Sequence, residues 1–146
     1  MRQVCGTAVL AIVAVSCSAT DPSFSNSTQL ALHRSEWQQQ NIHSYSFDYT
    51  VYGGYPGRAP VRIEVRADTV LSVVARSTGV VLPSAGWPTV DSLFSEIAHG
   101  ITAGNDQLQV QFNPILGYPV DIETNPHVGD GGLSINVGKF LPSLLN

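Results

Sequence analysis

The segments RAPVRIEV, residues 58–65, and GYPVDIET, residues 117–124, share the pattern Pro-Val-x-Ile-Glu at identical spacing. In both segments apolar residues alternate with charged ones, which is the period of a strand with one buried and one solvated face. Proline opens each pattern, where a missing backbone N–H is harmless. The two segments therefore predict two strands with valine and isoleucine in the core and with Arg62, Glu64, Asp121 and Glu123 at the surface.

The same alternation predicts four more strands, at residues 43–52, 69–76, 107–112 and 133–137. A run from Leu30 to Ile42, with Ser27 or Thr28 as N-cap, predicts a helix with a thin apolar stripe. A second helix follows Thr89 as N-cap, because Val90, Leu93 and Phe94 open a regular apolar face that continues to Gly100 or Gly104. Residues 53–57 and 77–88 are rich in Gly and Pro and predict loops.

The element order is helix-strand-strand-strand, written twice, with the Pro-Val-x-Ile-Glu pattern on the middle strand of each half. Short connections make each triplet an antiparallel meander. We therefore expect an α+β fold in which one antiparallel sheet carries both helices on one face. The repeated order favours an internal duplication over a chance match between two strands.

The first residues have the composition of a secretory signal. Met1-Arg2-Gln3 carries one positive charge, and residues 4–15 form an apolar run that is too short to span a membrane. The sequence Ala14-Val15-Ser16-Cys17 resembles the lipobox of bacterial lipoprotein precursors, which implies cleavage after residue 16 and a diacylglycerol on the Cys17 thiol. Ordinary secretory cleavage near Ala19, giving a secreted protein, is the alternative.

Cys17 is the only cysteine outside the apolar run, since Cys5 lies within it. An extracytoplasmic protein with one cysteine cannot form an intramolecular disulfide, and lipidation accounts for that residue. Residues 17–27 are polar after the cysteine and predict a flexible tether. Residues 28–146 then have the length of a single α+β domain.

The net charge of the chain argues against nucleic acid as a partner. Without Arg2, six basic and eleven acidic residues remain, a net charge of −5. Lys139 is the only lysine. An acidic chain without a basic run is not expected to bind nucleic acid.

The sequence contains no motif of an established catalytic or cofactor chemistry. The four histidines form no HExxH pair, no serine lies in a GxSxG turn, and no glycine-rich phosphate loop is present. We therefore expect a protein without catalytic residues, cofactor or metal. Asp48, Asp121 and Glu123 are the carboxylates on which a hydrolase could be built, but pairing with Arg62 or Arg66 across strands is the simpler interpretation.

Exposed aromatic residues are the remaining candidates for binding, because Tyr and Trp dominate binding hot spots. Tyr52 and Tyr55 flank a glycine pair, and we expect them in a recognition surface with Arg62, Asp121 and Glu123. Trp87 and Tyr118 precede prolines and are expected to cover the edges of the core.

Several phrases point together to a family: Trp37, then Asn41-Ile42-x-Ser44-Tyr45-x-Phe47, then Pro88-Thr89-Val90-Asp91-x-Leu93-Phe94, and finally Gly117-Tyr118-Pro119-x-x-Ile122. In this order they resemble the uncharacterised bacterial lipoproteins grouped as domain-of-unknown-function family 6174. The resemblance implies a fold and an extracytoplasmic location, and no established activity. Members commonly carry Cys-x-Cys after the first strand; here Gly53 and Tyr55 stand at those positions, so no role of that thiol pair is carried over.

These observations lead to three expectations about function. The first is a lipid-anchored extracytoplasmic protein, held on the cell membrane or outer membrane, that binds an envelope protein or a small ligand without catalysis. The second is a small-ligand carrier with a cavity beneath a curved sheet. The third is an envelope hydrolase that uses dispersed carboxylates.

Overall fold

The alternating segments form strands in the computed structural model, which describes residues 22–53, 59–105, 107–124 and 132–143. In chain order the elements are α1 (Pro22–Gln39), β1 (Tyr45–Tyr52), β2 (Val61–Arg66), β3 (Thr69–Ala75), β4 (Val81–Leu82), α2 (Val90–Thr102), β5 (Gln109–Phe112), β6 (Pro119–Thr124) and β7 (Leu133–Pro142).

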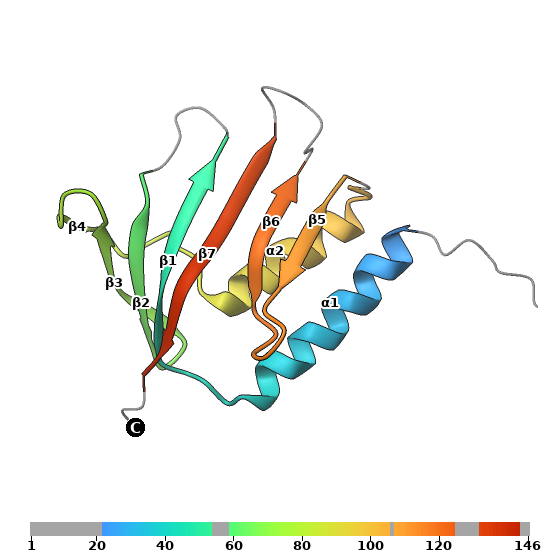
Figure 1. Cartoon of the computed structure of the whole chain (residues 1–146), viewed down its shortest axis with the longest axis horizontal. Coiled ribbons are helices and arrows are strands. Elements are labelled where there is room, and N and C mark those ends of the chain that lie inside the picture. The colour runs from blue at the N-terminus through green and yellow to red at the C-terminus, as the bar shows by residue number, and fades with distance from the viewer. Residues whose placement is uncertain (1–21, 54–58, 106, 125–131, 144–146) are drawn as a thin grey trace, which may run out of the picture.

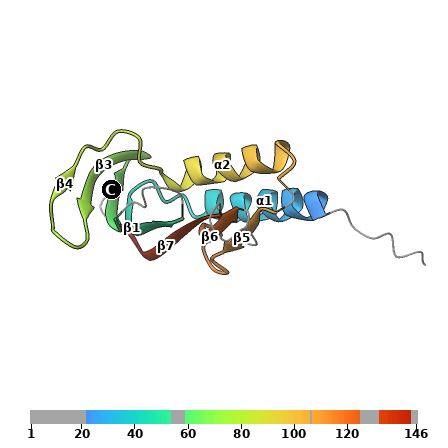
Figure 2. The same ribbon diagram turned by 90° about the horizontal axis from the view of Figure 1, so that it is seen from above.

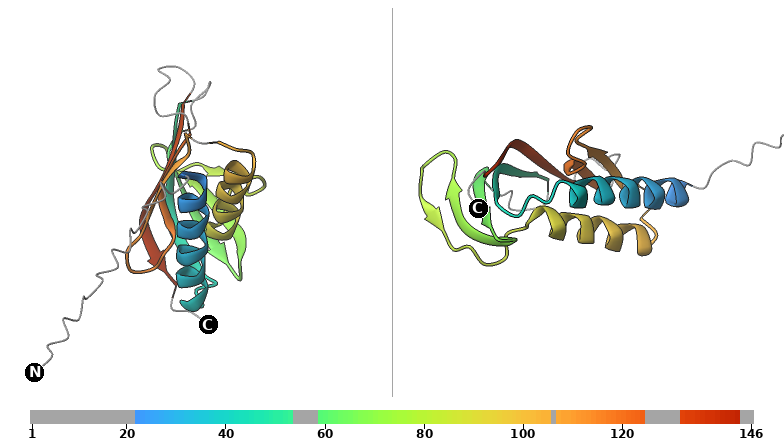
Figure 3. Two further views of the ribbon diagram at one scale, coloured as in Figure 1. Left: turned by 90° about the vertical axis from the view of Figure 1, so that its right-hand side faces the viewer. Right: turned by 90° about the horizontal axis from the view of Figure 1, so that it is seen from below.

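The strands form one antiparallel sheet in the order β4-β3-β2-β1-β7-β6-β5. The strands of each meander, β1–β3 and β5–β7, are neighbours in the sheet, and β1 pairs with β7 to join the two meanders at the centre (Figure 1). Both helices lie on the same face of the sheet, side by side (Figures 2 and 3). The expected α+β class, with an antiparallel sheet and both helices on one face, is confirmed.

The core lies between this face and the helices. Alternate residues of β1 and β2 are buried, among them Phe47 and Ile63, which are fully inaccessible to solvent. Helix α2 contributes Leu93 and Phe94 to the same core. At about 25 cal/mol per Å² of apolar area removed from water, this burial is the main force that holds the helices on the sheet.

Helix α2 begins where its sequence predicts. Thr89 is the N-cap, its hydroxyl accepts the backbone N–H of Ser92, and the Ser92 hydroxyl accepts the backbone N–H of Thr89. This reciprocal capping box satisfies two N–H groups near the helix start that have no partner within the helix.

The predicted bounds of the first helix and of the tether were wrong. Helix α1 begins at Pro22, so residues 22–27 are helical, and it ends at Gln39, before Ile42. Proline is favoured at the first helical position, and the preceding Asp21 is a residue type that caps helices well. Asn41 ends the helical path with a φ of 52°, a conformation that asparagine tolerates better than most residues.

Two further differences concern strands. Val81–Leu82, within a predicted loop, forms the short edge strand β4 beside β3. Strand β7 continues beyond Val137 to Pro142. The sequence did not predict this extension, because a bulge interrupts the alternation of apolar and polar residues. The register to β1 shifts at this bulge, where Lys139 has a φ of 45°. The extra residue returns Phe140 to the helix side, where it packs on Trp37 and Tyr118.

The topology does not support the expected internal duplication. β1 and β5 open the two triplets, lie at the centre and at the edge of the sheet, and run in opposite directions. Both helices nevertheless cover the same face. A rotation that superposed β1–β3 on β5–β7 in chain order would reverse the strand directions and so place the two helices on opposite faces of the sheet, which is not observed. The shared sequence pattern is instead explained by two middle strands with the same burial requirements.

Within the described residues, neither helix is both long and apolar enough to cross a membrane. Cys17 and the predicted signal segment lie outside the described part of the chain.

Candidate functional site

The face of the sheet opposite the helices, here called the open face, carries the polar members of each alternating strand. The strand register places them in rows that cross the sheet. One row runs through Gln109, Glu123, Ser134 and Tyr52. A second contains Gly138, Asp48, Arg62 and Val74.

Most of the residues predicted for binding share this face. Tyr52 and Glu123 both lie opposite Ser134, and Tyr52 is 61% exposed. Asp121 lies opposite Asn136 and accepts a hydrogen bond from Ser134 at 3.4 Å. The structure therefore brings Tyr52, Asp121 and Glu123 together. Tyr55 lies outside the described residues.

Arg62, the remaining predicted binding residue, lies on another part of the open face and is held by three partners. Its guanidinium donates to the Asp48 carboxylate at 3.0 Å, to the Ser46 hydroxyl at 2.8 Å and to the Lys139 carbonyl at 2.9 Å. These contacts join β1, β2 and the bulge of β7. A bound guanidinium with a fixed geometry is a better orienting group than a free one, because less side-chain entropy remains to be lost on binding.

Asp48 is surrounded by more cations than it can neutralise. Besides Arg62, the Nε of Arg76 lies 3.5 Å from its carboxylate and the Nζ of Lys139 lies 4.0 Å away. We call Arg62, Arg76 and Lys139 the basic cluster. Its three positive charges against one carboxylate leave an excess of two. Arg76 and Lys139 were not anticipated, because Arg76 follows the end of β3 and the bulge at Lys139 has no sequence signature.

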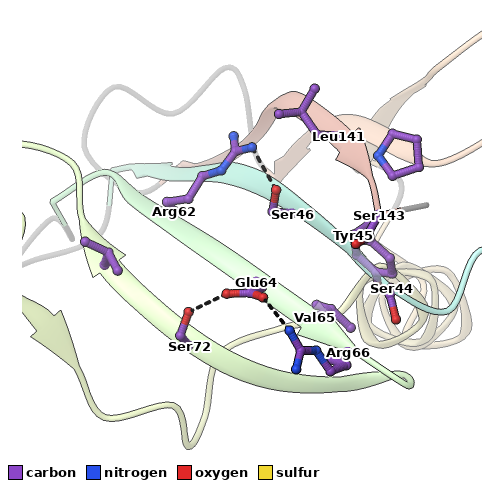
Figure 4. Close-up of a pocket in the computed structure, with 12 residues that line it drawn as sticks. Ser44, Tyr45, Ser46, Arg62, Glu64, Val65, Arg66, Ser72, Leu141 and Ser143 are labelled. Atoms are coloured by element: carbon purple, nitrogen blue, oxygen red, sulfur yellow. Dashed lines mark hydrogen bonds and ion pairs between the residues drawn. The ribbon is translucent and has the colours of Figure 1, made fainter. Parts of the chain in front are cut away.

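A groove of about 340 Å³ lies on the open face, and Arg62 lines it (Figure 4). Arg62 also belongs to the basic cluster, which therefore lies beside the groove. Arg62 reaches toward Ser46 at one end, while Glu64 pairs with Arg66 at 3.5 Å and accepts a hydrogen bond from Ser72 at 3.1 Å. The remaining lining residues are Ser44, Tyr45, Val65, Val74, Leu141, Pro142 and Ser143. Hydroxyl, charged and apolar groups thus face one concavity at the end of the sheet where β1 and β3 begin and β2 and β7 end.

A second cavity, of about 220 Å³, lies among α1, α2 and β5 and is lined by His33, Ile97 and Phe112, among others. Ligand pockets usually measure about 300–1,000 Å³, so this one is small for the predicted carrier cavity. The His33 ring stacks on Phe112 with 4.3 Å between ring centroids, and its Nδ1 lies 2.7 Å from a Glu36 carboxylate oxygen. One face and one nitrogen of the imidazole are therefore engaged by neighbouring residues.

His43 and His99 both lie on the surface. His43 contacts Asp68 at 2.8 Å on the exposed surface, and His99 lies in the last turn of α2, where a protonated imidazole complements the helix dipole. His127 lies outside the described residues. In the described part of the chain no three His, Cys, Asp or Glu side chains are grouped to hold a metal ion.

The carboxylates considered for hydrolysis have structural partners in two cases: Asp48 pairs with the basic cluster and Asp121 with Ser134. Burial raises the pKa of two tyrosines, Tyr45 and Tyr118, and both belong to the core. The Tyr45 hydroxyl accepts the backbone N–H of Val90 at 3.0 Å, which ties β1 to the start of α2. As expected from the sequence, Tyr118 is buried, and Trp87 is partly buried against Tyr49.

A family model described as a family of unknown function, DUF6174, matches residues 29–142. The match spans both helices and all seven strands described above, except the first turns of α1. No curated protein and no solved structure matches the chain significantly.

Proposed function

The chain belongs to the family of unknown function DUF6174, and we propose that it is a lipid-anchored extracytoplasmic protein that binds a ligand on its open face without catalysing a reaction. The observation that carries the binding role is the 340 Å³ groove, in which hydroxyl, charged and apolar side chains converge beside an ordered charge cluster. Convergent polar groups in a concavity of ligand size are the usual features of a binding site.

The anchoring half of the proposal rests on the charged start, the apolar run and Ala14-Val15-Ser16-Cys17. Acyl chains on Cys17 would hold the protein firmly on a membrane, because two or more chains anchor stably where one is marginal. Carriage of a ligand by the small cavity under the helices, and hydrolysis by paired carboxylates, have less support: the cavity is small, and two of the three carboxylates are engaged in ion pairs or hydrogen bonds.

Binding on the open face is tested by closing the groove. Ser72→Trp places an indole among the lining residues, whereas Ser95→Trp places one on the exposed surface of α2 and serves as the matched control. We expect the full chain and the control variant to capture the same envelope component after cross-linking, and Ser72→Trp to lose it. Equal capture by all three proteins would overturn the assignment of the open face.

Anchoring is tested separately with Cys17→Ala. We expect metabolic incorporation of a labelled fatty acid by the natural protein and none by the variant, which should accumulate as precursor or in the soluble fraction. A processed Cys17→Ala protein that remains with the membrane would show that the anchor is elsewhere.

A further inference from the structure

We infer that the groove and the basic cluster together bind a small anionic ligand, with its carboxylate or phosphate against the cluster and its uncharged part in the groove. The inference rests on the proposed function, since it names the class of ligand for the same face. It is argued from charge, from the order of the cluster and from the lining of the groove.

Within the described residues of this acidic chain, positive charge is concentrated around the groove. Four cations, Arg66 and the basic cluster, lie on or beside the groove with two carboxylates, Asp48 and Glu64, which leaves a local charge of +2. The whole chain carries −4, so its other charged residues sum to −6. An anion approaching the protein is therefore attracted to this end of the open face and repelled by most other surfaces.

The cluster is ordered before any ligand arrives. Asp48 is only 16% exposed and fixes Arg62, whereas Arg76 and Lys139 are 45% and 72% exposed at its rim. One carboxylate cannot neutralise three cations, so the two exposed ones retain charge for a second anion. Arginine donates through a planar fork that matches carboxylate and phosphate groups, which favours oxyanions over halides.

The lining of the groove determines which uncharged groups the anionic ligand can carry. Serine hydroxyls at residues 44, 46, 72 and 143 offer hydrogen-bonding groups along its wall, and Val74, Leu141 and Pro142 offer apolar surface. Its volume is at the lower end of the range for small-molecule sites. A hydroxylated acid such as an acidic sugar fits both surfaces, and a free phosphate fits the cluster alone.

The full chain is titrated with D-glucuronate, with inorganic phosphate and with D-glucose at low ionic strength, and backbone amide shifts are followed by NMR. Glucuronate and glucose differ by the charged group, and glucuronate and phosphate by the hydroxylated body. We expect saturable shifts for glucuronate at the start of β1, in β2 and at the end of β7, weaker binding of phosphate, and little effect of glucose. Added NaCl should weaken glucuronate binding, because exposed charges are screened.

Three substitutions at the basic cluster and one control substitution make the test specific. Arg76→Gln and Lys139→Gln should each weaken glucuronate binding about fivefold to tenfold, the size of effect expected for one charge in a partly exposed site. Asp48→Asn should tighten binding, because it removes the competing negative charge while the amide oxygen can still accept the hydrogen bond from Arg62 that orders the cluster. Arg34→Gln on α1 removes the same charge away from the groove and should change nothing. Thermal melting shows whether each variant is folded, and the exposed Lys139 makes Lys139→Gln the variant least prone to unfold.

The outcomes separate this inference from the proposed function. Anion binding that is insensitive to Arg76→Gln, Lys139→Gln and Asp48→Asn would overturn the inference, as would stronger binding of glucose than of glucuronate. If no anion binds but Ser72→Trp still abolishes capture of an envelope component, the anionic class is wrong and the binding face stands. If Ser72→Trp also has no effect, both proposals fall.

Discussion

Gly117 lies against the backbone of α1, which explains why a glycine stands two residues before β6. Its φ of 78° is in the left-handed region, and a Cβ atom there would lie 2.6 Å from the His33 carbonyl oxygen and 3.0 Å from the Trp37 nitrogen. Neither atom can move without distorting the helix. We expect Gly117→Ala to lower the free energy of unfolding by about 3 kcal/mol or more, the left-handed strain and the overpacking together.

Gly79 provides the matched control for this prediction. Its φ of 71° is similar, but no atom lies within 4 Å of the position of an added Cβ. Gly79→Ala should therefore cost about 1 kcal/mol, the conformational strain alone. Urea denaturation of both variants measures the difference, and equal losses of stability would show that α1 does not approach residue 117 so closely.

Tyr45 provides a prediction with a pH dependence. Burial, the larger effect, raises the pKa of its phenol above the ordinary value of about 10, although the hydrogen bond from Val90 opposes this. A raised folded pKa means that the neutral phenol is favoured in the native state. Its contribution to stability is complete below about pH 10 and is lost as the pH rises from there through the folded pKa.

The stability difference between Tyr45→Phe and the natural protein should therefore depend on pH. At neutral pH it leaves the buried N–H of Val90 without its acceptor, at a cost of about 1–3 kcal/mol. Above about pH 10 the natural protein should lose stability more steeply than the variant. Burial also raises the pKa of Tyr118, so the natural protein and the variant share the loss of stability that comes from Tyr118. Denaturation curves at pH 7 and pH 11 test this, and parallel pH profiles would contradict it.

At the scale of elements, the capping box at the start of α2 predicts a local loss of stability. Thr89→Ala removes the hydroxyl that accepts the Ser92 N–H and should cost about 1 kcal/mol. Thr102→Ala is the control, since its hydroxyl donates to the Ala98 carbonyl on the exposed surface near the other end of the helix. Thermal unfolding should separate the two variants, and an equal, small effect of both would show that the cap contributes little.

The elements that the sequence predicted well are those in which burial alone sets the pattern. Phe47, Ile63 and Leu93 lie on faces whose period matches the buried side of a strand or helix, and the structure buries all three. The start of α1 was missed, because residues 22–27 carry no apolar period in the sequence and only Asp21-Pro22 indicates a helix start. The extension of β7 was missed because the bulge at Lys139 breaks the alternation from within.

The candidate site was less predictable than the fold, for the same physical reason. Alternation places Arg62, Asp121 and Glu123 on the solvated faces of their strands, but it does not give the order of strands in the sheet. Only the pairing of β1 with β7 brings Lys139 to Asp48, and Arg76 reaches them from beyond the end of β3. A site built across strands that are distant in sequence has no local pattern.

At the scale of the molecule, the position of α1 determines how the proposed anchor would present the groove. Four residues separate Cys17 from Pro22, so the start of α1 would lie within about 18 Å of the lipid-bearing residue. Helix α1 has 18 residues and a length of about 27 Å, and Ser44 and Tyr45 of the groove follow soon after its end. In Figure 1 the start of α1 and the C-terminal end of β7, which borders the groove, lie at opposite ends of the fold.

An anchored protein should therefore hold the groove away from the membrane surface. Gln29→Cys near the start of α1 and Ser143→Cys at the groove each provide a thiol for a fluorescent donor, because the Cys17 thiol would be acylated. With acceptor dyes in the lipid, we expect energy transfer to be clearly stronger from residue 29 than from residue 143. Equal transfer from both positions would mean that α1 lies flat on the membrane, and stronger transfer from residue 143 would place the groove against the lipid, where a soluble anionic ligand could not reach it.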